Sequence, residues 1–86
     1  QKRPEKLRFT FKEKKEFETI DDEIAKLEEK LEELEENILA NATNSAKLYE
    51  LTTEKEKTEA KLEEKMERWV YLNDLAERIE VQRQDG

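Results

Sequence analysis

Apolar side chains recur at every third or fourth position through the first half of the chain. Between residues 17 and 38 the spacing alternates strictly between three and four. This spacing keeps the apolar side chains on one face of a helix and is typical of a coiled-coil seam. The residues of this first seam are Phe17, Ile20, Ile24, Leu27, Leu31, Leu34 and Ile38.

A second and weaker seam follows in the other half of the chain. Three of its positions are polar, which allows two interpretations. The polar residues set the register of the helix pair at a cost in stability, or the Lys stems lie along the apolar seam with their ammonium groups in water. The second seam consists of Leu48, Leu51, Lys55, Thr58, Leu62, Lys65, Trp69, Leu72, Ala76 and Ile79.

Capping signals predict where the two helices begin and end. Thr10-Phe11-Lys12-Glu13 has the spacing of a capping box, so the first helix should span about 11–40. Residues 41–45, Asn-Ala-Thr-Asn-Ser, are poor helix formers. We expect Asn41 to adopt a left-handed C-terminal cap and Thr43 or Asn44 to cap a second helix over about 44–83. Weak helix propensity also predicts an irregularity near residues 19–22.

A short polar turn between two long helices favours antiparallel neighbours. The charges beside the seams support this arrangement, because one register pairs Lys30 with Glu54, Glu23 with Lys61 and Glu16 with Arg68. The predicted fold is therefore all-α, a two-helix antiparallel coiled-coil hairpin with a short extended N-terminal segment. Its parts are a basic extended arm at 1–10, the hairpin at 11–83 with its turn near 41–44, and a tail at 84–86.

Composition argues against several classes of function. The chain has one Gly, one Pro, no Cys and no His, and 48% of its residues are charged. We therefore expect no sheet, no thiol or imidazole chemistry, no metal site, no cofactor and no catalytic residue. The paired glutamates lie between seam residues on the outer face of the helices, where nothing would bury them, and they are therefore poor candidates for acid–base catalysis. No apolar run is long enough to span a membrane and no signal peptide is visible, so we expect a cytoplasmic chain without a membrane partner.

Positive charge is concentrated at the start of the chain. Residues 1–15 carry a balance of +5, whereas residues 16–86 carry −12. Such an arm can neutralise phosphates without reading sequence. Phe9 and Phe11 either stack on bases or cover the open end of the hairpin, and Trp69 is expected to pack in the core against Phe17. The candidate nucleic-acid-binding residues are Lys2, Arg3, Lys6, Arg8, Lys12, Lys14, Lys15 and Arg78.

One segment at each end of the chain has a distinctive sequence. The first is Lys6-Leu7 followed by Phe9-Thr10-Phe11-Lys12-Glu13-Lys14-Lys15-Glu16-Phe17-Glu18, and the second is Met66-Glu67-Arg68-Trp69-Val70-Tyr71-Leu72. Both resemble the C-terminal coiled-coil domain of ABC-F family ATPases of the Uup type. The turn lacks the Asp-Pro that is common in the family. The resemblance implies a DNA-binding or ribosome-associated element that follows two ATP-binding cassettes in a longer protein.

These observations predict a non-catalytic C-terminal module of an ABC-F type ATPase. We expect it to contact DNA or ribosomal RNA weakly and without sequence preference, through the basic arm and the open end of the hairpin. Its other partner would be the ATP-binding cassettes of the parent chain, and we expect no oligomer. The net charge of −7 and plain outer faces favour an alternative, a purely structural or protein–protein interaction coiled coil.

Overall fold

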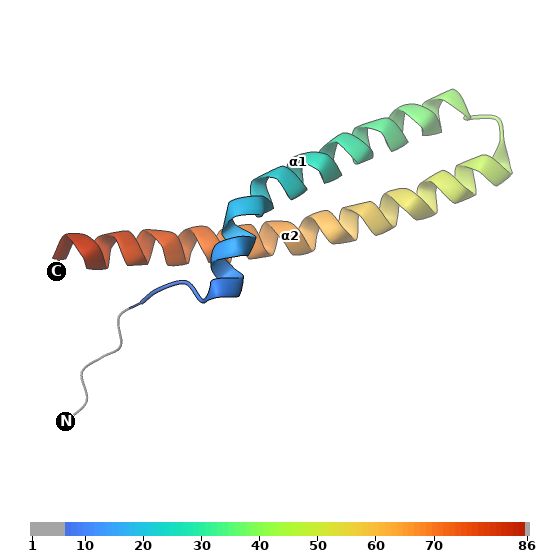
Figure 1. Ribbon diagram of the computed structural model, residues 1–86. Helices are drawn as coiled ribbons and strands as arrows, with labels where there is room; N and C mark the ends of the chain where they lie inside the picture. The colour runs from blue at the N-terminus through green and yellow to red at the C-terminus, as the bar shows by residue number, and fades with distance from the viewer. Residues whose placement is uncertain (1–6, 86) are drawn as a thin grey trace.

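Two long helices lie antiparallel and are joined by a four-residue turn (Figure 1). The computed structural model describes residues 7–85. Helix α1 spans Phe11–Ala40 and helix α2 spans Ser45–Asp85. The predicted all-α hairpin is thus confirmed, with α1 at its expected bounds and α2 ending two residues later than expected. Neither helix is long and apolar enough to cross a membrane within the described residues.

The start of α1 is fixed by the predicted capping box. The Thr10 hydroxyl oxygen accepts a hydrogen bond from the Glu13 backbone N–H at 3.1 Å, and Glu13 Oε1 accepts one from the Thr10 N–H at 3.0 Å. Thr10 itself has extended geometry, with φ −69° and ψ 164°. Two backbone donors that the first helical turn leaves without partners are therefore satisfied by side chains.

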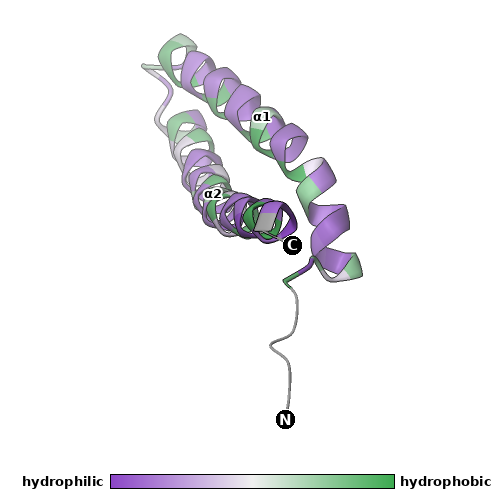
Figure 2. Ribbon diagram, turned by 90° about the vertical axis from the view of Figure 1, so that its left-hand side faces the viewer, coloured by the Kyte–Doolittle hydropathy of each residue, from purple (hydrophilic) through white to green (hydrophobic). Residues whose placement is uncertain are grey.

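Helix α1 bends near Thr19 without a break. The Thr19 hydroxyl donates to the carbonyl oxygens of Lys15 (3.3 Å) and Glu16 (3.4 Å). A hydroxyl bonded back to the preceding turn tends to bend a helix, and this is the site where an irregularity was predicted. The first turns of α1 consequently run obliquely to α2, whereas the remainder runs alongside it (Figures 1 and 2).

The turn differs from the prediction at its first residue. Asn41 has φ −113° and ψ 28°, so the expected left-handed cap is wrong. Its side-chain amide donates to the Asn37 carbonyl at 2.8 Å, and this side-chain cap satisfies a terminal carbonyl without the left-handed conformation. Asn44 does cap the second helix, because its side-chain oxygen accepts from the Lys47 N–H at 3.1 Å.

The core is a single thin seam between the helices. Among the described residues, four apolar side chains are buried in it, Ile20 and Leu34 from α1 and Leu51 and Leu72 from α2. Most of both ribbons is hydrophilic, with hydrophobic residues returning at intervals along each helix (Figure 2). Thr58 is also buried, and its hydroxyl donates to the Glu54 carbonyl at 2.8 Å, so this polar seam residue leaves no unsatisfied donor.

Trp69 lies at the edge of the seam rather than in the core. Its side chain is 40% exposed, and the indole N–H donates to Asp21 at 2.7 Å. Phe17 instead stacks on Phe9, with ring centroids 5.1 Å apart. The predicted burial of Trp69 in the core is therefore wrong. Leu72, in the next turn of α2, is fully buried, whereas the indole turns outward to place its N–H on a carboxylate.

Cross-helix ion pairs confirm the predicted register with one change. Lys30 Nζ lies 3.0 Å from Glu54, and Arg68 lies 2.7 Å from Glu16. Glu23 pairs with Lys65 at 3.0 Å instead of the predicted Lys61. Lys65 occupies a seam position, and its long stem reaches from the seam to the carboxylate.

The described residues before α1 are hydrogen-bonded to the C-terminal end of α2. The Gln82 side-chain amide donates to the Leu7 carbonyl at 3.0 Å, and its oxygen accepts from the Leu7 N–H at 2.9 Å. Helix α2 has 41 residues against 30 in α1, so its last turns extend past the start of α1 (Figure 1). The two hydrogen bonds hold the chain just before α1 against this extension.

Candidate nucleic-acid interface

The basic residues predicted to bind nucleic acid fall into three groups. Lys2, Arg3 and Lys6 lie outside the described residues. Arg8, Lys12, Lys14 and Lys15 are exposed, and none of the four forms an ion pair with any of residues 7–85. We call these four residues the basic cluster. Within the part of the chain that the structure describes, none of its charges is therefore held in an ion pair.

Arg78 does not join the basic cluster. Its guanidinium pairs with Asp74 of the same helix at 3.1 Å, and both side chains are exposed. The spacing of four residues, with the acid first, is the favoured arrangement for a helical ion pair. Arg78 also does not line the groove that contains Lys12 and Lys15, described next.

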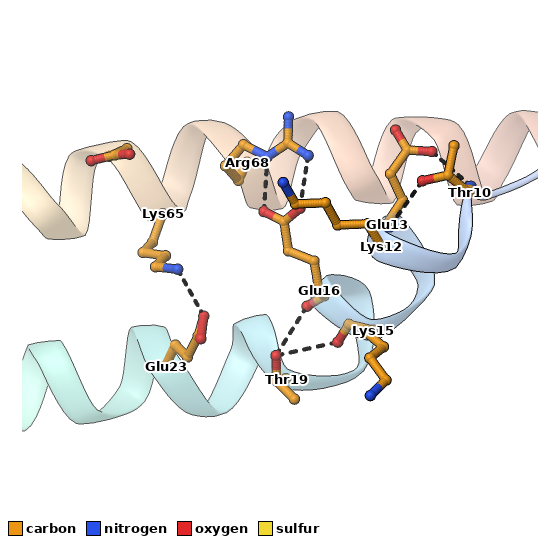
Figure 3. A pocket seen from close by; sticks show the side chains of 10 residues that line it. Thr10, Lys12, Glu13, Lys15, Glu16, Thr19, Glu23, Lys65 and Arg68 are labelled. Atoms are coloured by element: carbon orange, nitrogen blue, oxygen red, sulfur yellow. Dashed lines mark hydrogen bonds and ion pairs between the residues drawn. The ribbon is translucent and has the colours of Figure 1, made fainter.

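A groove with a volume of about 920 Å³ lies where α1 crosses α2 (Figure 3). Lys12 and Lys15 enter it from α1, and Lys65 and Arg68 enter it from α2. The last two residues were not predicted as part of the site. Their place in the charge register gave a signal, since Arg68 was expected opposite Glu16 and hence beside Lys12 and Lys15.

The groove also contains acidic side chains, which form ion pairs with the two cations that α2 contributes. Glu16 accepts two hydrogen bonds from Arg68, at 2.8 and 2.7 Å, and these hold the pKa of Glu16 below its usual value of 4.5. The same contact raises the pKa of Arg68, whose guanidinium also lies 4.8 Å from the Tyr71 ring centroid. Glu23 Oε2 accepts no hydrogen bond from residues 7–85, but it lies 3.0 Å from the Lys65 ammonium. Among these cations, Lys12 and Lys15 are the two left for an external anion.

Glu13 connects the start of α1 to α2. One carboxylate oxygen accepts from the Thr10 N–H, and the other accepts from the Tyr71 hydroxyl at 2.7 Å. The bond from the Thr10 backbone, followed by that from Tyr71, lowers the pKa of Glu13. The contact raises the pKa of Tyr71. This arrangement fixes the turn of helix that carries Lys12, Lys14 and Lys15.

The two phenylalanines of the basic segment have different roles. Phe9 is half-buried and stacks on Phe17, as expected for a residue that covers the open end of the hairpin. Phe11 is 78% exposed, so the interpretation that it covers the open end of the hairpin is wrong. The ammonium of Lys15 lies 5.3 Å from the centroid of the Phe11 ring, a cation–π contact on the surface. Phe11 and Lys15 thus form one exposed aromatic and cationic patch.

The class of the chain follows from its similarity to known proteins. Residues 8–74 match the family described as the ABC transporter C-terminal domain. The chain belongs to this family, as its two end segments predicted, and it corresponds to a C-terminal domain rather than to an ATP-binding cassette. No solved structure matches it.

One relative carries the same region in a much longer chain. The chain is 40% identical over 79 residues to the uncharacterized ABC transporter ATP-binding protein YfmR of Bacillus subtilis (strain 168). The match covers 90% of this chain and 13% of that protein. The described hairpin thus corresponds to a small part of an ABC-type ATP-binding protein.

Proposed function

We propose that this chain is the C-terminal module of an ABC-F type ATPase that contacts the phosphates of DNA or ribosomal RNA. The observation that carries the proposal is the basic cluster, four exposed cations within eight residues that have no ion-pair partner among residues 7–85. Lys and Arg bind phosphates by charge and release counterions, so the contact is weak and independent of sequence. In the cytoplasm, the ATP-binding cassettes of the parent chain would deliver the module to its target.

The charge distribution limits where a nucleic acid can lie. Residues 16–86 have a balance of −12 and repel phosphates along most of the hairpin. Contact is therefore confined to the basic cluster and the residues before it, at the open end of the molecule. The exposed Phe11 ring beside Lys15 offers an aromatic surface for an unpaired base at the same place.

A salt titration of binding tests this function. If four cations engage duplex DNA, the logarithm of affinity should fall against the logarithm of salt concentration with a slope of about −3.6, at about −0.9 per phosphate. Replacing Lys12, Lys14 and Lys15 by Gln should reduce the slope to about −0.9 while leaving helical content unchanged. Fluorescence anisotropy with a labelled duplex and with a labelled structured RNA measures the affinity of both proteins at each salt concentration, and circular dichroism measures their helical content.

A matched variant controls for net charge. Replacing Lys47, Lys57 and Lys61 by Gln removes the same three charges from exposed positions on α2. This variant should keep the slope of the unmodified chain if the basic cluster is the interface. Equal reductions of the slope in both variants would show that binding depends on overall charge and not on the basic cluster. Absence of binding to both nucleic acids at low salt would reject the proposal in favour of a coiled coil that binds protein.

A further inference from the structure

The two sides of the helix pair carry different charges where α1 and α2 run alongside each other. One side holds the ion pairs Glu23–Lys65 and Lys30–Glu54. The opposite side is formed by positions one and four residues after Phe17, Ile24, Leu31 and Ile38 in α1, and after Leu48, Lys55, Leu62 and Trp69 in α2. Between residues 20 and 73 these positions contain seven acidic residues and no Lys or Arg. We call this side the acidic flank.

The difference is not a general effect of an acidic composition. Over the same residues, the mirror positions on the ion-paired side contain six basic and five acidic side chains. Basic residues are therefore plentiful on one side and excluded from the other. The hydrogen bond from the Trp69 indole to Asp21 lies on the acidic flank and does not neutralise the carboxylate.

An apolar groove opens on the acidic flank. Its floor is made by Leu31, Leu62, Met66 and Val70, and its rim by Glu59, Glu63 and Glu67. The groove has a volume of about 450 Å³, and Met66 and Val70 remain 47% and 60% exposed. Large apolar side chains surrounded by like charges neither join the core nor improve solubility, which is typical of a binding surface.

The chemistry of this groove selects one kind of occupant. Phosphates of nucleic acid and anionic lipid are repelled by the glutamates of the rim. A second copy would set the same acidic rim against itself and is repelled for the same reason. An amphipathic helix with apolar side chains on one face and Lys or Arg beside them complements both the floor and the rim.

The geometry points to this groove as a docking site for a basic amphipathic helix of a protein partner. The site is separate from the basic cluster, because none of the residues that form its floor and rim lines the groove that contains Lys12 and Lys15. The inference therefore goes beyond contact with nucleic acid. It gives the module two surfaces of opposite charge, each suited to a different class of partner.

Two adjacent glutamates provide the first test. The probe is a synthetic helical peptide with Leu on one face and Lys on the other, titrated into the 86-residue chain by isothermal calorimetry. Glu63→Lys reverses a charge on the rim, and Glu64→Lys makes the same change one residue away, in the other groove. Glu63→Lys should weaken binding about fivefold, while Glu64→Lys should change it less than about twofold.

Two exposed valines test the apolar floor. Val70 lies in the groove at 60% exposure, and Val81 lies outside it at 52%. Val70→Ser should weaken peptide binding about threefold, and Val81→Ser should leave it unchanged. Both positions are exposed, so circular dichroism should show unaltered helicity in each variant.

Three results would overturn the inference. Equal effects of Glu63→Lys and Glu64→Lys would show that the peptide responds to the chain's overall charge, and equal effects of Val70→Ser and Val81→Ser would show that it does not bind in this groove. Sedimentation equilibrium showing a dimer of the unmodified chain that Glu63→Lys dissociates would assign the groove to a second copy. Duplex DNA that shifts the nuclear magnetic resonance signals of Met66 and Val70 as strongly as the peptide does would assign it to nucleic acid.

Discussion

Leu72 and Trp69 lie on the same seam of α2, yet only Leu72 is fully buried. Leu72→Ala should cost about 2–5 kcal/mol, because it removes apolar contacts and leaves a cavity. That loss is comparable to the whole stability of a small domain, so helicity should fall at room temperature. Trp69→Ala should cost less, about 1–2 kcal/mol, since the indole is partly in water. Urea unfolding followed by circular dichroism measures both values.

The exposed Leu39 of α1 serves as the control for these truncations. Leu39→Ala deletes the same atoms as Leu72→Ala from a side chain that contributes little to the core. Its midpoint of unfolding should stay near that of the unmodified chain. A Trp69→Ala variant less stable than Leu72→Ala would contradict the burial described above.

The Glu16–Arg68 pair makes stability depend on acid in a defined direction. The pKa of Glu16 is lowered by the hydrogen bonds from Arg68, so its contribution is present above pH 4.5 and is lost as pH falls through the lowered pKa. Glu16→Gln should therefore destabilise the chain by about 0.5–1 kcal/mol at pH 7, as expected for a partly exposed pair. The difference between the two proteins should shrink below pH 4.5.

The measurement is urea unfolding of both proteins at several pH values. A difference that stays constant down to pH 3 would mean that the Glu16 carboxylate does not stabilise the fold through its charge. Glu33→Gln, at an exposed position that makes no ion pair with residues 7–85, controls for the change in net charge.

Side-chain burial was only partly predictable from the sequence. The alternation of three and four placed Ile20, Leu34, Leu51 and Leu72 on the seam, and all four are buried. The same alternation placed Trp69 there, but periodicity gives a direction around the helix and not the rotamer of a large polar-tipped ring. It also did not show that the stem of Lys65 would reach Glu23 in place of Lys61.

At the scale of the element, the capping box positions α1 and the basic residues on its first turns. Thr10→Ala removes the hydroxyl that accepts from Glu13 and should destabilise the chain by about 1 kcal/mol. Thr10→Ser keeps that oxygen and should remain close to the unmodified protein. Thermal melts followed by circular dichroism distinguish the two, and equal melting temperatures for both variants would contradict the role of the cap.

The limits of the helices were predicted better than their path. Local signals, the capping box and the polar turn, act within a few residues and gave the bounds of α1 and the cap at Asn44. An irregularity was expected near Thr19, but the direction of the bend depends on which carbonyl oxygens accept hydrogen bonds from the Thr19 hydroxyl. The oblique course of the first turns, and the groove that brings Lys65 and Arg68 beside Lys12 and Lys15, follow from that direction.

At the scale of the whole molecule, a cluster of positive charge lies at one end and a row of negative charge lies along one side. The basic cluster lies at the open end, and the acidic flank runs along the helix pair. The nucleic-acid and peptide experiments should therefore give independent results. Glu63→Lys should leave the salt slope for DNA unchanged, whereas Gln at Lys12, Lys14 and Lys15 should leave peptide binding at the groove unchanged.

The bond between Gln82 and Leu7 also determines how the hairpin can carry force. It places residue 7 beside residue 82, while the turn lies at the opposite end of the molecule. Pulling on residues 7 and 82 would therefore load these two hydrogen bonds before it loads the turn. A neighbour attached near residues 7 and 82 would leave the turn at the distant end of the molecule.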